Sequence, residues 1–420
     1  RRALAQSGMA TVMALPFAVL AFVLVPRLPG ALWTMPGGET AQTGLSDEMS
    51  PGSISELAIS DVIAFRVRFE DEVPPPAQRY WRGPVLHDFD GFTWRARGMG
   101  GAARSQEVEY LSPPLRYQVM LEPHGKSWLF ALDAAASLDG PRHFRSFDGQ
   151  LLGNRPVSSP LIYTAVSHVE WRNPGPLSVV GRRLDTRLPE GRNPRSLALA
   201  QALRAESTDD ADYARRVMQY FGSGGFTYSL TPPLLDYNSV DDLLFNTRLG
   251  FCGHFASAYV TLMRAAGVPA RVVTGYLGGT YNPIGDYYVV RQSEAHAWAE
   301  VWLEGRGWTR FDPTSMVAPE RLQRGLSEFL PGARGAADAL VQRAGWLRTL
   351  RDGWDAAGAW WRERVVHFNA ARQRDLLGWL GLGDLDYRGM AALLLAGALF
   401  WGGVLLALAA LRRPRTRADA

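Results

Sequence analysis

Three residues in the second half of this 420-residue chain have the side chains that nucleophilic catalysis requires, namely Cys252, His296 and Asp312. A thiolate can attack a carbonyl carbon, an imidazole can take and return its proton, and a carboxylate can orient that imidazole. Cys252 is the only cysteine in the sequence, which excludes an internal disulfide framework, an iron–sulfur cluster and a cysteine-based zinc site. A lone cysteine is more often a small buried hydrophobe than a nucleophile, so its surroundings must decide between the two.

The sequence around Cys252 predicts that this residue begins a helix. Apolar residues recur after it at helical spacing, and Gly267 followed by Pro269 ends the pattern. These apolar residues are Phe255, Tyr259, Leu262 and Ala266. Free N–H groups and the positive end of the helix dipole favour a thiolate, and they could also hold the oxyanion of a tetrahedral intermediate. Gly250 and Gly253 leave room there for a substrate backbone, which favours function over packing for Cys252.

His296 begins a strand pattern whose alternate residues are apolar. It shares one face with Trp298, Glu300 and Trp302. A three-residue hairpin loop at 303–305 would pair Trp302 with Arg306 and place Asp312 opposite His296. The alternatives are a hydrogen-bonded strand histidine and a turn aspartate with no catalytic role.

Four further residues are candidates for contacting the substrate or an oxyanion. They are Gly253, His254, Tyr276 and Trp298. His254 is the rival general base, but two residues along a helix it would point about 200° away from Cys252, so it is interpreted as a packing or substrate-lining residue. No dense carboxylate cluster accompanies the motifs, so neither a metal ion nor a cofactor is expected.

Four blocks of sequence in the second half together resemble the three motifs of the transglutaminase-like superfamily. The blocks are LGFCGHFA at 249–256, GVPARVVTGY at 267–276, HAWAEVW at 296–302 and GWTRFDPT at 307–314. In the first half, the blocks at 56–60, 80–84 and 88–94 are similar to a bacterial inner-membrane subgroup, the TgpA-type protein-glutamine γ-glutamyltransferases. Where members of this subgroup often have Tyr-Cys-Glu-His, this chain has Phe251-Cys252-Gly253-His254.

The resemblance implies an α+β fold with a papain-like transglutaminase core. In such a core an N-terminal helix that carries the cysteine packs on an antiparallel sheet that carries the histidine and the acid. The resemblance assigns the nucleophile, the base and the orienting acid to Cys252, His296 and Asp312. It also implies a glutamine side chain as the acyl donor. An N-terminal membrane region of several spans is typical of the subgroup, and only one such span is expected in this chain.

Two apolar stretches predict transmembrane helices. Residues 389–411 contain no charge and are long enough to cross a bilayer. Four arginines follow within residues 412–417, which indicates a cytoplasmic C-terminus. Residues 8–25 are also uncharged and follow two arginines, a pattern that a cleavable signal peptide shares. Two spans would place residues 26–388 on the periplasmic side of a bacterial inner membrane.

Composition shifts divide the chain into six predicted segments. They are a transmembrane helix and exit at 1–30, a linker at 31–59, an all-β module at 60–178, a catalytic domain at 179–320, a helical juxtamembrane region at 321–386, and a span with a basic tail at 387–420. The juxtamembrane region is rich in tryptophan, which is typical of a bilayer interface but also of packing beneath the catalytic domain.

Three functions remain open from the sequence. The first is acyl transfer from a glutamine-type carboxamide to an amine on a protein or peptide of the cell envelope. The second is hydrolysis of the same acyl-enzyme by water, as in a peptidase or amidase, and the third is a catalytically silent envelope scaffold. A net charge of +4 indicates no nucleic-acid partner, so the expected partners are an envelope substrate and the lipid bilayer.

Overall fold

The computed structural model describes residues 14–25, 44–97, 108–324, 345–361, 370–383 and 385–411. The chain forms two compact units. One comprises residues 38–356, and the other comprises residues 1–37 together with residues 357–420.

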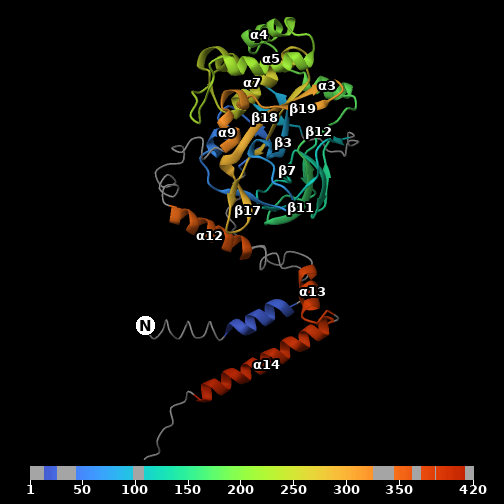
Figure 1. The fold of residues 1–420 in the computed structure, drawn as a ribbon, viewed down its shortest axis with the longest axis vertical. Helices are drawn as coiled ribbons and strands as arrows, with labels where there is room; N and C mark the ends of the chain where they lie inside the picture. Colours follow the sequence, from blue (N-terminus) through green and yellow to red (C-terminus); the bar gives the residue numbers. More distant parts are fainter. Residues whose placement is uncertain are drawn as a thin grey trace, which may run out of the picture. The chain divides into compact units, whose positions relative to one another are not determined.

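A seven-stranded antiparallel sheet carries His296 and runs through the larger unit (Figure 1). Its strands lie in the order β1-β4-β3-β15-β18-β19, and β7 also pairs with β3. Their bounds are β1 Glu48–Met49, β3 Tyr80–Phe89, β4 Trp94–Ala96, β7 Ala131–Leu132, β15 Ala270–Leu277, β18 Ala295–Leu303 and β19 Gly307–Phe311. Every residue of β15 and β18 is buried, so both faces of the sheet centre are covered.

A second sheet packs against the first. Its order is β16-β17-β2-β6-β11-β8. The bounds are β2 Ile63–Phe69, β6 Leu115–Leu121, β8 Ala134–Asp139, β11 Leu161–His168, β16 Thr280–Asn282 and β17 Tyr287–Arg291. Trp81 of β3 meets Phe65 and Tyr117 of the second sheet at ring-centroid distances of 5.4 and 5.6 Å. These aromatic contacts join the two sheets into one core.

Helices cover the first sheet on the side of α7 (Cys252–Ala265), and α4 and α5 lie over α7 (Figure 1). Other helices of this unit, with the bounds of α4 and α5, are α2 Ser53–Leu57, α3 Val179–Asp185, α4 Pro194–Ala205, α5 Asp210–Ser223, α6 Ser239–Asp241, α8 Thr314–Val317 and α9 Pro319–Arg324. Short connecting elements are η1 Pro76–Gln78, η2 Asp242–Thr247, η3 Gln292–Glu294, β5 Glu109–Tyr110, β9 His143–Arg145, β10 Leu151–Gly153, β12 Trp171–Arg172, β13 Thr227–Tyr228 and β14 Leu249–Gly250.

The segment predicted as a separate all-β module, residues 60–178, shares both sheets with the segment at 179–320. In the first sheet, Leu86 pairs with Val272, and in the second, Val67 pairs with Tyr288. The boundary predicted at residue 178 therefore separates no compact units, although the α+β class and the β-rich first half are confirmed. Alternation in the sequence identifies the buried face of a strand but not its partner, which explains the error.

The predicted linker at 31–59 is in part folded. Within it, β1 pairs with β4, and the side chains of Leu45, Met49 and Ile54 are buried in the main core. Residues 31–43 lie outside the described residues. The linker prediction is therefore wrong for residues 44–59, whose few apolar side chains are spaced too irregularly to reveal an element by periodicity.

The hairpin between β18 and β19 has a three-residue loop, but one residue later than expected. Leu303 pairs with Gly307 and Trp302 with Trp308, so the loop comprises residues 304–306. The predicted pairing of Trp302 with Arg306 is wrong by two residues. A shift of two residues keeps every side chain on its face of the sheet, so the expected faces are unaffected.

Three helices follow the larger part of the fold, namely α12 Gly345–Trp361, α13 Ala370–Trp379 and α14 Tyr387–Leu411. Within α14, residues Arg388–Ala407 are long and apolar enough to cross a membrane, with a mean hydropathy of 2.1. The helix Ala14–Leu24 is apolar but shorter, so among the described helices one candidate span is found where two were predicted. Residues 8–13 of the predicted first span and the four arginines after Leu411 lie outside the described residues.

The tryptophans of the juxtamembrane region are exposed rather than packed. They are Trp346, Trp354, Trp360, Trp361 and Trp379. Helix α12 also contacts the second sheet through Asp355. This carboxylate forms an ion pair with Arg66 and accepts a hydrogen bond of 2.7 Å from the Tyr287 hydroxyl.

Candidate active site

Cys252 is the first residue of α7, as the sequence predicts. The parallel pair β13–β14 places Gly250 beside Tyr228 and delivers the chain to the helix start. Phe251 is the N-cap residue in an extended conformation, and the helix ends at Ala265, two residues before Gly267, where φ is +76°. The Cys252 side chain is fully buried, so its thiol is surrounded by protein groups, at the end of the helix where backbone N–H groups have no partner within the helix.

His296 and Asp312 form a buried pair. The Nε2–H of His296 donates to Oδ2 of Asp312 at 2.7 Å. Asp312 follows the last residue of β19, and the register places it opposite Trp298 rather than opposite His296. The contact is therefore diagonal across the hairpin, and the sequence correctly predicts that the two side chains meet although the pairing behind that prediction is wrong.

Asp312 is held in place by two further groups. Its Oδ1 accepts a hydrogen bond of 3.0 Å from the Thr314 backbone N–H, and its Oδ2 accepts one of 2.7 Å from the Tyr80 hydroxyl. Burial alone would raise the pKa of Asp312, but His296, Tyr80 and Thr314 lower it below the usual value. Asp312 is therefore a carboxylate whose position and charge are both fixed.

The charge of Asp312 changes the titration of His296. Burial lowers the pKa of His296, but the adjacent Asp312 carboxylate, together with Cys252, raises it to about 9. The imidazole is thus protonated at neutral pH. Its other ring nitrogen, Nδ1, is buried and has no well-formed hydrogen bond among the described residues, which leaves it available to the neighbouring Cys252 thiol. The arrangement therefore sets a protonated imidazole beside the Cys252 side chain.

Aromatic and cationic groups enclose this pair from the side of β3. The Tyr80 ring lies 5.2 Å from Trp298, and the Arg310 guanidinium lies 3.9 Å above the Tyr80 ring. Burial and the Asp312 charge raise the pKa of Tyr80 well above its usual value, so its hydroxyl stays protonated and donates. Tyr80 belongs to a motif noted in the sequence, but nothing in its spacing indicates that it contacts Asp312.

His254 takes a structural position. Its Nδ1 accepts a hydrogen bond of 3.2 Å from the Phe251 backbone N–H, which closes the first turn of α7. Burial lowers the pKa of His254 to about 4, so the ring is neutral at neutral pH. The adjacent Gly253 packs close to Met49, where an added Cβ would lie 3.1 Å from the sulfur. These contacts favour the packing role over that of a general base.

The other two candidate residues lie in different surroundings. Tyr276 packs against Phe65 and Phe130 in the core, and its hydroxyl donates to Gln292 at 2.7 Å. Trp298 lies next to His296, with 6.3 Å between ring centroids. Its indole N–H is buried without a hydrogen bond among the residues that the structure describes, so it is a donor close to the imidazole.

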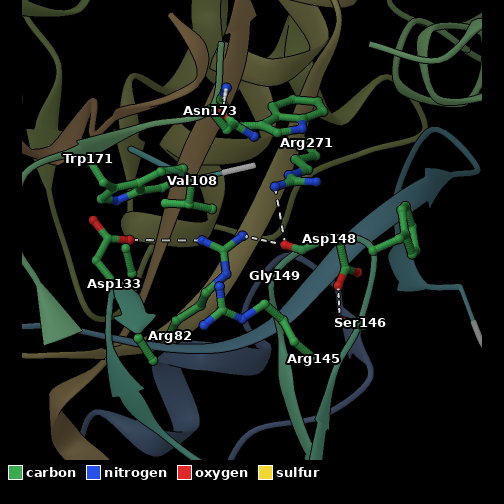
Figure 2. Close-up of a pocket in the computed structure, with 14 residues that line it drawn as sticks. Arg82, Val108, Asp133, Arg145, Ser146, Asp148, Gly149, Trp171, Asn173 and Arg271 are labelled. Atoms are coloured by element: carbon green, nitrogen blue, oxygen red, sulfur yellow. Dashed lines mark hydrogen bonds and ion pairs between the residues drawn. The ribbon is translucent and has the colours of Figure 1, made fainter. Parts of the chain in front are cut away.

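A second buried charge cluster lies further along β18. Glu300 binds Arg82 and Arg271, and both arginines also donate to the backbone oxygen of Asp148. Figure 2 shows Arg82, Arg271 and Arg145 lining a cavity on this side of the sheet, with Asp133 at its edge. Across the described ranges, no group of three or more His, Cys, Asp or Glu side chains could hold a metal ion.

Two family profiles match the chain. The profile of the transglutaminase-like superfamily matches residues 197–313, and that of the TgpA N-terminal domain matches residues 1–172. Together with the 41% identity to a TgpA domain that this chain covers almost completely, these matches show that the chain belongs to the transglutaminase-like superfamily, and within it to the TgpA group.

A particular relative is the protein-glutamine gamma-glutamyltransferase of Pseudomonas aeruginosa, which is 38% identical over 421 residues, covering 98% of this chain and 62% of that protein. The crystal structure of the periplasmic domain of TgpA from the same organism has a TM-score of 0.66 and 41% identity, covering 68% of this chain and 99% of that chain. The protein YebA of Bacillus subtilis is 40% identical over 30% of this chain and 18% of its own length. This chain thus spans less than two thirds of the curated relatives' length.

Proposed function

We propose that this chain is a membrane-anchored cysteine acyltransferase that moves the acyl group of a glutamine-type carboxamide to an amine on cell-envelope substrates. The observation that carries this proposal is the His296–Asp312 pair, 2.7 Å from Nε2 to Oδ2, with the remaining ring nitrogen available to a cysteine at a helix start. Membership of a family that includes a protein-glutamine gamma-glutamyltransferase supports the choice of substrate.

In the proposed reaction Cys252 is the nucleophile, His296 the acid and base, and Asp312 the orienting group. The Cys252 thiolate attacks the carboxamide carbon, and the tetrahedral intermediate carries its charge on the former carbonyl oxygen. The C–N bond then breaks, and ammonia leaves with the proton that the His296 imidazolium donates. The remaining thioester is attacked by an amine, whose proton His296 takes, so that an amide forms and the thiolate is restored.

Transfer rather than hydrolysis requires that water be kept from the thioester. The side chains of Cys252 and His296 are fully buried, which supports exclusion of water and so favours an amine acceptor. Hydrolysis by the same residues is the alternative outcome, and it would make the protein an amidase or peptidase.

The membrane topology is part of the proposal. The helix α14 is proposed to cross the inner membrane, with the C-terminus in the cytoplasm and the catalytic unit in the periplasm. The exposed tryptophans of the juxtamembrane region would then lie at the bilayer interface. Helix Ala14–Leu24 belongs to the proposed first span. A green fluorescent protein fused to the C-terminus should fluoresce, because this reporter folds in the cytoplasm and not after unfolded export, and a dark but stable fusion would contradict the topology.

The activity is tested with the full chain in lipid nanodiscs, a glutamine-containing peptide and a fluorescent primary amine. Release of ammonia together with amine incorporation supports transfer, and a Cys252→Ala variant serves as the control. Ammonia release with only free carboxylate formed would identify a hydrolase. Absence of both products with a panel of glutamine peptides, from a protein whose Cys252 reacts with iodoacetamide, would contradict the proposed substrate.

A further inference from the structure

Arg321 is a fully buried arginine outside the residues that the proposed mechanism uses. It lies in α9, and none of its guanidinium nitrogens makes a well-formed hydrogen bond within the described part of the chain. The carboxylate paired with it is that of Glu294, with 3.7 Å between Nη1 and Oε2. A buried guanidinium is costly unless a nearby anion compensates its charge, and one contact at 3.7 Å is weak compensation.

The position of Arg321 joins the two segments that carry the nucleophile and the base. Its partner Glu294 precedes His296 by two residues and ends η3, directly before β18. Its other neighbour, the Tyr228 hydroxyl, belongs to β13, where Tyr228 pairs with Gly250 two residues before Cys252. The Tyr228 ring also lies 5.2 Å from Phe251, the N-cap of α7. The next residue in α9, Leu322, packs in one cluster with Trp298 and Tyr80, beside the His296–Asp312 pair.

We propose that Arg321 is a positioning residue whose buried positive charge, held between Tyr228 and Glu294, keeps Cys252 in its thiolate form. The Cys252 side chain interacts electrostatically with Arg321, so its thiolate would be a further anion for this guanidinium. Burial alone would lower the pKa of Arg321, whereas Tyr228, Glu294 and Cys252 raise it, so the guanidinium stays charged beside the thiol. This inference rests on the proposed role of Cys252 as the nucleophile, but it concerns the thiol itself and not the substrate.

The thiol of Cys252 has several charged or titratable neighbours that an experiment must separate. The groups that interact with Arg321 or with the thiol are Tyr228, Glu294 and His296. Asp312 acts on Tyr228 and His296, and Arg79 adds a second positive charge near Glu294. Arg79 is buried like Arg321, but its guanidinium donates to the backbone oxygens of Pro74 and Gly279. Arg79 is therefore a matched control, because it is a buried arginine beside the same carboxylate with its own hydrogen bonds.

The test is the pH dependence of Cys252 alkylation by iodoacetamide in the full chain, which needs no substrate. Arg321→Met should move the midpoint of the alkylation profile upward by about one pH unit, so that alkylation below the midpoint slows about tenfold. Arg321→Lys should restore most of that shift, because the charge is kept. Arg79→Met should leave the midpoint within a few tenths of a unit.

Glu294→Gln gives a shift in the opposite direction. Without the competing carboxylate, the charge of Arg321 acts on Cys252 alone, so the midpoint should fall. If Arg321→Met shows no cooperative thermal unfolding and so is not folded, Glu294→Gln tests the proposal in its place. A folded Arg321→Met protein with an unchanged midpoint would overturn the proposal, and so would an unchanged or raised midpoint in Glu294→Gln. Because alkylation is measured without an acyl donor, a wrong substrate assignment does not affect these results.

Discussion

Two buried charged groups on the same strand, Glu300 and His296 of β18, have contrasting surroundings. Two guanidinium nitrogens of Arg82 and two of Arg271 bind the Glu300 carboxylate. Nη2 and Nε of Arg271 lie 2.8 and 2.9 Å from its Oε2. At the other end, His296 has one firm partner, while its Nδ1 and the indole N–H of Trp298 remain without a well-formed hydrogen bond in the described residues. Buried polar groups are normally satisfied, so His296 and Trp298 lack partners that the Glu300 carboxylate has, and under the proposed function a substrate would supply them.

The two clusters also respond to pH in opposite directions. Burial would raise the pKa of Glu300, but Arg82 and Arg271 lower it to about 2, so its contribution to folding is present above the usual glutamate pKa and lost as the pH falls toward 2. The pKa of His296 is raised to about 9, so its contribution is complete below the usual histidine value and lost as the pH rises through about 9. The Glu300 contribution is thus lost only in strong acid, whereas the His296 contribution is lost only as the pH rises through about 9.

Among the substitutions that test this comparison, Cys252→Ala should have the largest effect on activity. It removes the nucleophile, so transfer should fall by at least about four orders of magnitude. The melting temperature should change by only a few degrees, because Ala fits the space of a small buried side chain. Amine incorporation and thermal unfolding measure the two effects, and residual activity above about one part in a thousand would contradict the assignment.

Asp312→Asn tests the orienting carboxylate. We expect turnover to fall about a thousandfold, because the imidazole loses the charge that stabilises its protonated form. The pKa of the His296 imidazole should also fall from about 9, since Asp312 provides the largest effect that opposes burial of His296. Titration of this ring by NMR checks the shift, and an unchanged pKa would show that Asp312 does not set the charge of His296.

Glu300→Gln should affect stability more than chemistry. It leaves Arg82 and Arg271 buried without their carboxylate, which costs about 3–5 kcal/mol of unfolding free energy. In the fraction that remains folded, turnover should be within a few-fold of the unmodified chain. Urea unfolding and active-site titration separate the two quantities. The exposed pair of Arg172 and Glu109 is a control, and Arg172→Gln should leave the unfolding midpoint nearly unchanged.

Tyr80→Phe has the smallest expected effect. It removes one hydrogen bond of 2.7 Å to Asp312, while the His296 and Thr314 contacts remain. A hydrogen bond to a charged group contributes about 1.5–3 kcal/mol, so turnover should fall by roughly ten- to a hundredfold. The Michaelis constant should stay within about twofold if Tyr80 positions only Asp312. A change confined to the Michaelis constant would indicate substrate contact instead.

The sequence contains the information that places Cys252 at a helix start and brings His296 to Asp312. The former follows from local apolar spacing and a terminal glycine, and the latter follows from strand alternation, which tolerates a register error of two residues. The loop position itself could not be predicted. Both Gly305 and Gly307 have positive φ, and Asn173 occupies the space beside Gly307 and accepts a hydrogen bond of 2.7 Å from the Trp308 backbone N–H. That decisive contact comes from a distant part of the chain.

Arg321 and Tyr80 were missed for a related reason. Neither lies in a helix or strand pattern that distinguishes it from an ordinary surface arginine or core tyrosine. Their significance depends on burial and on partners such as Glu294 and Asp312, which only the folded chain brings near. The same limit applies to the strands at 60–178, whose partners in β15 and β17 lie far along the sequence.

The pairing of β3 with β15 also bears on how the protein reaches its native state. During synthesis β3 emerges long before β15, and until then one of its long edges has no final partner. Contacts between such distant segments slow folding, and an unpaired edge strand invites association with other chains. The larger unit should therefore fold late and as a whole, only after the residues of β15, beyond Cys252, have been made.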